Sequence, residues 1–391
     1  MKNYLRCRGW KDFIVICVAV ALWTGVRHYL SPPSDYSKWK ARVKAAPELS
    51  ISHEPGQSGL PPCFFIVPQK AVNHPTLDSG SVDDCLSLLP NGQRLDVFEI
   101  SFVGGFLPIK TDLYVPDTIP LAFTRTYVPL TTWSERFQVF LPHVYDPFLT
   151  GSRLPYTYVD WRLPDGQSVH YERISPGTGF SDAIFGAASS GRIFTSSRVN
   201  WNGFGWDWTL PDGTTYLSPE AYNATRPQQG SLVGIFDGNG NEVRLSRGER
   251  GELTEIESPG GRWIRLEYDH LRMIRARDSS GNAVEYEYDP GGRLSAVKYP
   301  GGNATKYSFD TKNRIVEVED PSEDVAMEIK YDSNGAVAAA ITTDIEHTYH
   351  FRYSFDKASK TLNAFVVEPH GKVIHVRIRN QEGKLAYSIQ R

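Results

Sequence analysis

A short phrase recurs along residues 237–391 and limits what this chain can fold into. It reads aromatic residue, Asp, two variable residues, Gly or Asn, one residue, and then an aliphatic residue, as in Tyr288-Asp289 through Gly292 to Leu294. Successive aliphatic residues lie 18 to 25 positions apart. Such a period predicts an array of identical supersecondary units, each of which needs its neighbours to bury its apolar face. The aromatic-Asp pair is intact at Tyr268-Asp269, Tyr288-Asp289, Phe309-Asp310, Tyr331-Asp332 and Phe355-Asp356, and the aliphatic residue falls at Leu253, Leu271, Leu294, Ile315, Val337, Leu362 and Leu385.

The residues before each Asp alternate in character. Tyr286 and Tyr288 share one face of an extended chain, and Glu285 and Glu287 share the other. This period of two is typical of a half-buried strand. Each Asp then stands at the first position of a type I turn, and the Gly or Asn three residues later accepts positive φ. Each repeat is therefore predicted to contain two antiparallel strands and two reverse turns, with a tighter hairpin at 268–271, where the turn residues are lost.

The spacing of the aliphatic residues leaves one question open. Leu253 and Ile256 are three residues apart, as are Leu294 and Val297. Simple alternation places such pairs on opposite faces of a strand. A β-bulge or a change of the buried face would both bring them to one side, and the sequence does not choose between these.

The phrase resembles the YD repeat of the RHS family in bacteria, which is shared with the teneurin shell of animal cell surfaces. The resemblance covers residues 237–391, and the segment 105–127 resembles the domain that precedes the repeats in RHS proteins. It implies a long β-sheet that spirals into a hollow shell, often around a C-terminal toxin. The RHS core motif tied to self-cleavage is not recognisable, and the sequence up to Arg391 still resembles the repeat. We therefore expect an all-β protein of tandem antiparallel hairpins that forms a long, curved or spiralling sheet, with one N-terminal transmembrane helix.

The chain divides into four segments. Residues 1–30 combine a basic start with an apolar run, which predicts a signal anchor, and cleavage as a signal peptide is the alternative. Residues 31–94 are expected to be a linker with a disulfide-tied part, 95–236 an RHS-type N-terminal β domain, and 237–391 the repeats. The anchor would place the bulk of the chain in the periplasm or outside a bacterial cell.

Cysteine usage agrees with export. Cys63 and Cys85 are the two cysteines beyond the N-terminal segment. An even pair in an oxidising compartment predicts one disulfide, and two unpaired thiols are the alternative. Peptide mapping without reduction would decide between them.

Aromatic side chains supply the one candidate for a ligand platform. Trp201, Trp206 and Trp208 lie close together, and Trp206 and Trp208 share a strand face. An exposed ledge of rings could stack on a sugar. The alternative is that they fill the core, because Asp207 alternates with them and indicates one wet and one dry face.

The functional prediction is a structural or binding scaffold and not an enzyme. No serine-hydrolase elbow, phosphate loop, zinc-protease motif or paired CxxC occurs in the sequence, so we predict no catalytic residue, no metal site and no cofactor. The net charge of −3 gives no sign of a nucleic-acid partner. The predicted partners are the membrane, through the N-terminal helix, and a glycan or protein surface. The alternatives are a toxin-delivery remnant without its toxin, or a polysaccharide hydrolase.

Overall fold

The computed structural model describes most of the chain after residue 108. The described residues are 94–95, 100–101, 109–127, 143–164, 168–187, 196–221, 227–270, 272–320, 325–333, 335–342, 348–359, 361–368, 371–381 and 384–390. The predicted anchor at 1–30 and the predicted Cys63–Cys85 disulfide lie outside these ranges. Within them, no helix has the length and apolar character needed to cross a bilayer.

The described chain is built of β-strands, with one short 3-10 helix, η1 (Pro227–Gly230). Two strand pairs come first: β1 (Arg94–Leu95) with β2 (Ile100–Ser101), and β3 (Ile109–Val115) with β4 (Leu121–Thr126). A long sheet begins with β5 (Phe148–Gly151), β6 (Tyr158–Arg162), β7 (Ser168–Arg173), β8 (Ile184–Ala187), β9 (Arg198–Trp201), β10 (Gly205–Thr209), β11 (Thr215–Pro219) and β12 (Gly234–Phe236). It continues through β13 (Glu242–Arg247), β14 (Leu253–Glu257), β15 (Trp263–Asp269), β16 (Arg272–Asp278), β17 (Ala283–Tyr288), β18 (Leu294–Lys298), β19 (Ala304–Phe309), β20 (Ile315–Asp320), β21 (Val325–Tyr331), β22 (Val337–Thr342), β23 (Thr348–Asp356), β24 (Thr361–Val367), β25 (Val373–Gln381) and β26 (Lys384–Gln390).

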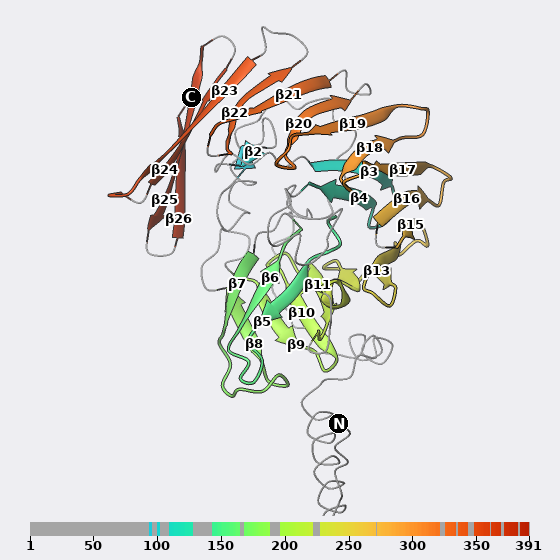
Figure 1. Cartoon of the computed structure of the whole chain (residues 1–391). Coiled ribbons are helices and arrows are strands. Elements are labelled where there is room, and N and C mark those ends of the chain that lie inside the picture. The colour runs from blue at the N-terminus through green and yellow to red at the C-terminus, as the bar shows by residue number, and fades with distance from the viewer. Residues whose placement is uncertain are drawn as a thin grey trace, which may run out of the picture.

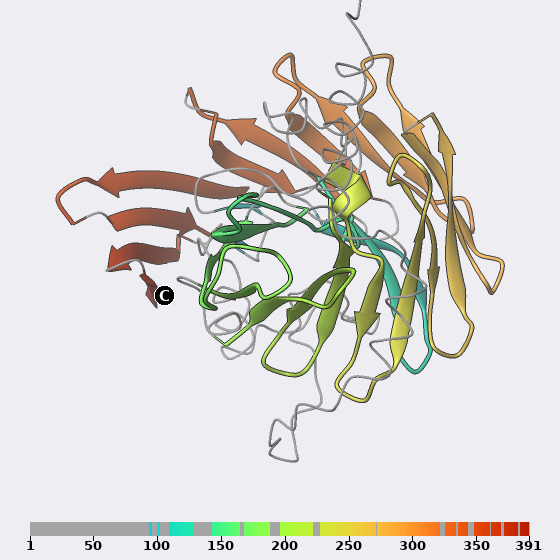
Figure 2. The same ribbon diagram turned by 90° about the horizontal axis from the view of Figure 1, so that it is seen from below.

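Each strand of the long sheet pairs antiparallel with the strand that follows it in the sequence, from β5 to β26. An isolated bridge between Phe148 and Ser231 joins β5 to the segment before β12, so the first turn of the sheet closes on itself. From β13 onward the sheet winds upward and around, as Figures 1 and 2 show. The predictions of an all-β chain and of a long, curved antiparallel sheet are confirmed.

The Asp of each repeat and the Gly or Asn three residues later form the predicted turn. At Asp289 the amide of Gly292 donates to the Asp289 carbonyl (2.8 Å), and the Asp289 carboxylate accepts the amide of Arg293 (2.9 Å). Gly292 has φ 80°, in the left-handed region that glycine tolerates best. Asp310 makes the same bonds with Asn313 in the glycine position, at φ 60°. The same pattern appears at Asp332 and Gly335.

The aliphatic pairs three residues apart are reconciled by a β-bulge. Tyr288 lies opposite Leu294, whereas Glu287 lies opposite Ala296, so Ser295 is the extra residue. Leu294 and Val297 are consequently buried on the same side of the sheet. Equivalent register shifts occur at the pairs β13–β14, β15–β16, β19–β20 and β21–β22.

The hairpin at Tyr268 is tighter than those at Tyr288, Phe309 and Tyr331, as predicted. Asp269 pairs with Arg272, which leaves a two-residue turn with His270 at φ 56°. Leu271, which the sequence suggests as the aliphatic residue of this unit, lies outside the described residues. Met273 occupies the buried position opposite Tyr268 instead. The shortened turn moves the buried residue two places along the sequence.

The aromatic residue of each repeat also reaches the hairpin before it. The Tyr288 hydroxyl donates to the carbonyl of Met273 (2.8 Å), and the Tyr331 hydroxyl donates to that of Ile315 (2.7 Å). Tyr268, Tyr288, Phe309 and Tyr331 are half-buried and pack against the core, whereas the side chain of Phe355 lies outside the described set. The units of Tyr288 and Tyr331 are therefore tied to the hairpin before them by a ring and by a hydrogen bond.

A substitution at the turn glycine measures the cost of its backbone conformation. Gly292→Ala is expected to lower the free energy of unfolding by about 1–2 kcal/mol, because an L side chain is strained at positive φ. Its Cβ would also meet the Arg272 side chain at 2.6 Å. Gly291→Ala, in the same turn but outside the positive-φ set, is the control and should cost less. Equal losses in chemical denaturation would contradict the turn assignment.

Candidate functional site: an internal plug and an outer face

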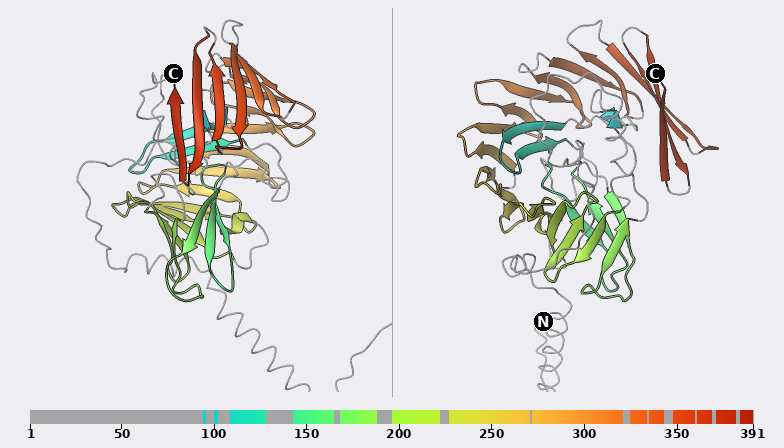
Figure 3. Two further views of the ribbon diagram at one scale, coloured as in Figure 1. Left: turned by 90° about the vertical axis from the view of Figure 1, so that its left-hand side faces the viewer. Right: turned by 180° about the vertical axis from the view of Figure 1, so that it is seen from behind.

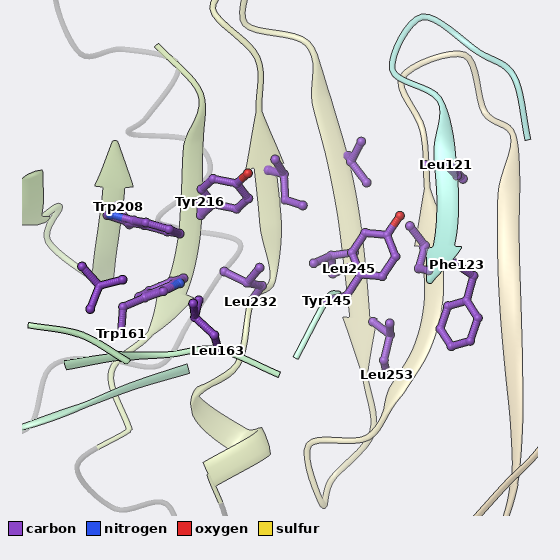
Figure 4. Packing of buried hydrophobic residues seen from close by; sticks show 14 of the residues in the cluster. Leu121, Phe123, Tyr145, Trp161, Leu163, Trp208, Tyr216, Leu232, Leu245 and Leu253 are labelled. Atoms are coloured by element: carbon purple, nitrogen blue, oxygen red, sulfur yellow. The ribbon is translucent and has the colours of Figure 1, made fainter. Parts of the chain in front are cut away.

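Strands β3 and β4 form a hairpin that lies inside the curve of the sheet. We call residues 109–126 the plug hairpin. Figures 1 and 3 show it against the inner side of the strands that follow β14, and β3 contacts β15 and β16. Leu121 and Phe123 of β4 are fully buried. In Figure 4 they lie beside Tyr145, Leu245 and Leu253 of the shared core.

A buried ion pair lies where the plug hairpin meets the shell. The Arg125 guanidinium contacts the Asp112 carboxylate at 2.9 Å, and both side chains are almost completely buried. The hydroxyls of Tyr286 and Tyr299 each donate to Asp112 at 2.9 Å. Arg125 also stacks over the ring of Tyr307, 5.3 Å from its centre. A buried charge pair is tolerated when its remaining hydrogen-bonding positions are filled, and both tyrosines fill those of Asp112.

The electrostatics of this pair fix its protonation. Burial, followed by the negative charge of Asp112, raises the pKa of Tyr286 well above its ordinary value. Burial opposes the charge on Arg125, yet the attraction of Asp112 leaves the pKa of Arg125 well above its usual range. The tyrosine hydroxyl therefore remains a donor and the arginine remains a cation throughout the accessible pH range.

Further contacts fasten the plug hairpin along several repeats. Lys110 pairs with Asp320 of β20 at 2.9 Å, and Asp117 accepts a hydrogen bond from Ser258, which follows β14. The Tyr127 hydroxyl, just after β4, donates to the carbonyl of Asn313 (2.8 Å). These attachment points run from the end of β14 to the end of β20. The plug hairpin thus braces consecutive repeats from within.

The outer face of the sheet carries paired charges. Across β14 to β20 outward residues form pairs of opposite charge between neighbouring strands: Arg265–Glu255 (2.6 Å), Arg277–Glu267 (3.6 Å), Arg275–Glu285 (3.9 Å), Lys298–Glu287 and Lys306–Glu319 (3.3 Å). One aromatic ring lies among them. Trp263 is half-buried, with the guanidinium of Arg265 at 4.1 Å and that of Arg277 at 5.8 Å from its ring centre. We call Trp263, Arg265 and Arg277 the outer-face patch.

Comparison with known proteins finds a family match within the repeats. The sequence of residues 264–370 matches the family model described as the teneurin YD-shell. This part of the chain is similar to a YD-shell. The match confirms the resemblance seen in the repeated phrase, and it covers β15 to β24 apart from the first residue of β15.

Solved structures also match this chain, at low sequence identity. The structure entitled "Crystal Structure of TcdB2-TccC3-TEV" has 14% identity and a TM-score of 0.31, and the match covers 74% of this chain and 16% of that chain. For "Crystal Structure of TcdB2-TccC3" the values are 15% identity, a TM-score of 0.31, 71% of this chain and 16% of that chain. The present chain therefore spans 16% of the length of these structures. No curated protein matches the sequence.

The tryptophans suggested as a ligand platform lie upstream of the YD-shell match and point into the core. Trp206 and Trp208 are buried, and their indole N–H groups donate to Glu220 and to the hydroxyl of Tyr171, each at 2.6 Å. Trp201 is half-buried and packs edge-on against Trp206, with ring centres 5.1 Å apart. Of the two possibilities that the sequence offered, core filling applies to Trp206 and Trp208, because both rings lie in the interior and form no exposed ledge. Ligand binding by the three residues stays a prediction.

The outer-face patch, at the start of the YD-shell match, is a candidate site that was not predicted from the sequence. Ile264 and Leu266 are buried, so Trp263 and Arg265 must alternate with them onto the outer face. The signal was present in the alternation of β15 itself. The plug hairpin offered no comparable signal, because its contacts join residues as far apart as 210 positions, as between Lys110 and Asp320.

Proposed function

We propose that this chain is a non-catalytic shell scaffold that is exported, anchored to the membrane by residues 1–30, and binds a glycan or protein surface through its outer face. The observation that supports the proposal is the difference in composition and burial between the two faces of the sheet. Side chains of the sheet and the plug hairpin fill the inner face, whereas the outer face exposes charges and the half-buried ring of Trp263. A partner would therefore meet the outer face first.

The outer-face patch has the composition of a contact hot spot. Trp and Arg are the residues most enriched where interfaces lose affinity on truncation. The Trp263 ring offers apolar area, and Arg265 and Arg277 flank it with cations. Such a group fits an acidic sugar or an acidic protein surface, since guanidinium groups bind carboxylates with defined geometry.

Binding by the full chain tests the proposal. A glycan panel and labelled cell surfaces are the probes, and the patch variant Trp263→Ala/Arg265→Ala is compared with Lys298→Ala/Lys306→Ala, which removes two outer-face cations elsewhere. The patch variant should weaken binding by about tenfold or more, the scale of a hot-spot truncation, and the control should change it little.

Three outcomes would contradict the proposal. Equal losses in the two variants would remove the outer-face patch from it. Hydrolysis of a glycan on the panel, abolished by replacing one carboxylate, would show an enzyme. Protection of the chain after residue 30 both from protease added to intact cells and from protease added to opened periplasm would contradict export.

A further inference from the structure

The plug hairpin is joined to the shell by a buried histidine. His143 forms a backbone bridge with Arg125 of β4, and its ring packs beside Phe123 (5.1 Å between ring centres) and Tyr145 (6.3 Å). The side chain is buried, and its Nε2 lies 3.2 Å from Oδ2 of Asp146. Among the residues that the structure describes, Nδ1 of His143 has no hydrogen-bond partner.

An arginine of the shell completes the junction. Arg247 of β13 contacts Asp146 at 3.1 Å and donates to the carbonyls of Leu232 (2.8 Å), Gly251 (2.8 Å) and Tyr145. Arg247 lies opposite Leu253 across a bulge, as Tyr288 lies opposite Leu294. It therefore occupies the aromatic position of the repeat. Its guanidinium therefore ties the segment that carries His143 to the sheet. We call His143, Asp146 and Arg247 the latch.

The charges around His143 disfavour a second cation beside Arg247. Among the residues that the structure describes, Asp146 is the carboxylate that contacts the ring, and it is already shared with Arg247. The other titratable groups that face the latch are the phenols of Tyr145 and of Tyr268 on β15, which are neutral at ordinary pH because burial raises the pKa of both. On the side of β4, the neighbours are the Arg125 backbone and the Phe123 ring. A proton on Nδ1 would therefore lie buried without an acceptor in the described surroundings, beside an arginine.

We propose that the latch is an acid-sensitive release, in which protonation of His143 loosens the plug hairpin from the shell. The proton comes from solvent and adds to Nδ1, so the ring becomes a cation with two N–H donors. One donor faces Asp146, and the other has no acceptor until the junction opens to water. Opening would expose the interior surface that the plug hairpin covers.

The direction of the pH dependence follows from where the proton binds. Burial lowers the pKa of His143 from 6.5 to about 4, although Asp146 favours the charged ring. In the open state the ring meets water and regains its ordinary pKa. Between these two values the open state binds more protons than the closed state, so acidification favours opening. Above pH 6.5 neither state binds the proton, and the latch stays closed.

Hydrogen exchange on the full chain tests the latch. Amide protection is compared between β3–β4 and β15–β17 from pH 7.5 to pH 4, with rates corrected for intrinsic exchange. In the wild type, the opening of β3–β4 should grow by about 150-fold as the pH falls from 7.5 to 4, because acidification favours the open state by tenfold per pH unit between the two pKa values and the closed state is half protonated at pH 4. His143→Phe, which cannot be protonated, should abolish that growth while β15–β17 behave as in the wild type.

Two results would overturn the proposal. One is an identical pH profile for β3–β4 in the wild type and in His143→Phe. The other is simultaneous loss of protection in β3–β4 and β15–β17, which would show general unfolding. If His143→Phe does not fold, His143→Asn replaces it, and an NMR titration of the wild-type ring serves as a second measurement. A pKa of 6 or higher for His143 in the closed state would then end the case.

Discussion

Asp112→Ala is expected to lower the free energy of unfolding by about 3–5 kcal/mol. The substitution leaves the Arg125 cation buried without its counter-charge and the hydroxyls of Tyr286 and Tyr299 without their acceptor. A buried charge that loses its partner costs far more than the pair contributes. Chemical denaturation followed by far-ultraviolet circular dichroism measures the loss.

The double variant Asp112→Leu/Arg125→Met separates the two contributions. It removes both charges and keeps apolar volume, so it should recover most of the stability that Asp112→Ala loses. Tyr286→Phe is a milder comparison and should cost about 1.5–3 kcal/mol, the scale of one hydrogen bond to a charged group. A double variant less stable than Asp112→Ala would show that the charges stabilise the junction and do not merely tolerate burial.

Trp208→Ala is expected to cost about 3–5 kcal/mol, the range for truncating a large buried aromatic residue. Its ring is fully buried, lies 4.5 Å from that of Trp161, and donates a hydrogen bond to Tyr171. Truncation would open a cavity and leave the Tyr171 hydroxyl without one of its partners. The midpoint of denaturation, read by circular dichroism and not by tryptophan fluorescence, reports the change.

Trp263→Ala is the matched control for that substitution. The residue type is the same, but Trp263 is half-buried on the outer face and interacts mainly with Arg265 and Arg277. An exposed cation–π contact is worth about 0.5–1 kcal/mol, so the loss should stay near that value. If the two tryptophans proved equally costly, the assignment of inner and outer faces would be wrong.

The repeated units could be predicted from the sequence because their determinants are local. The residues that define a unit lie close together in the sequence, as Asp289, Gly292 and Leu294 do. The turn hydrogen bonds of Asp289 and Gly292 join residues at most four positions apart. Alternation then assigned Tyr286 to the inner face. The bulge was left as one of two choices, because a register shift depends on the partner strand and the sequence of one strand does not contain it.

The plug hairpin and the latch could not be predicted in this way. Asp112 and Tyr286 are 174 positions apart, and no periodic pattern connects them. The burial of the tryptophans was left open by the sequence for a related reason. Period two shows that Trp206 and Trp208 share a face, but whether that face meets water depends on which strands lie across from it. In this fold Trp161 of β6 lies there.

The bulges of the repeats have a geometric consequence. In the hairpins β13–β14, β15–β16, β17–β18, β19–β20 and β21–β22 the extra residue falls on the second strand, directly after the residue opposite the aromatic position of the repeat. A bulge bends its strand and increases its twist in a fixed sense. Because these hairpins contribute bends of one sign, the angles add, whereas β23–β24 pairs without a shift. The coiling of the ribbon therefore depends on the number of bulged hairpins, so deleting one of them would reduce the total rotation without changing its handedness.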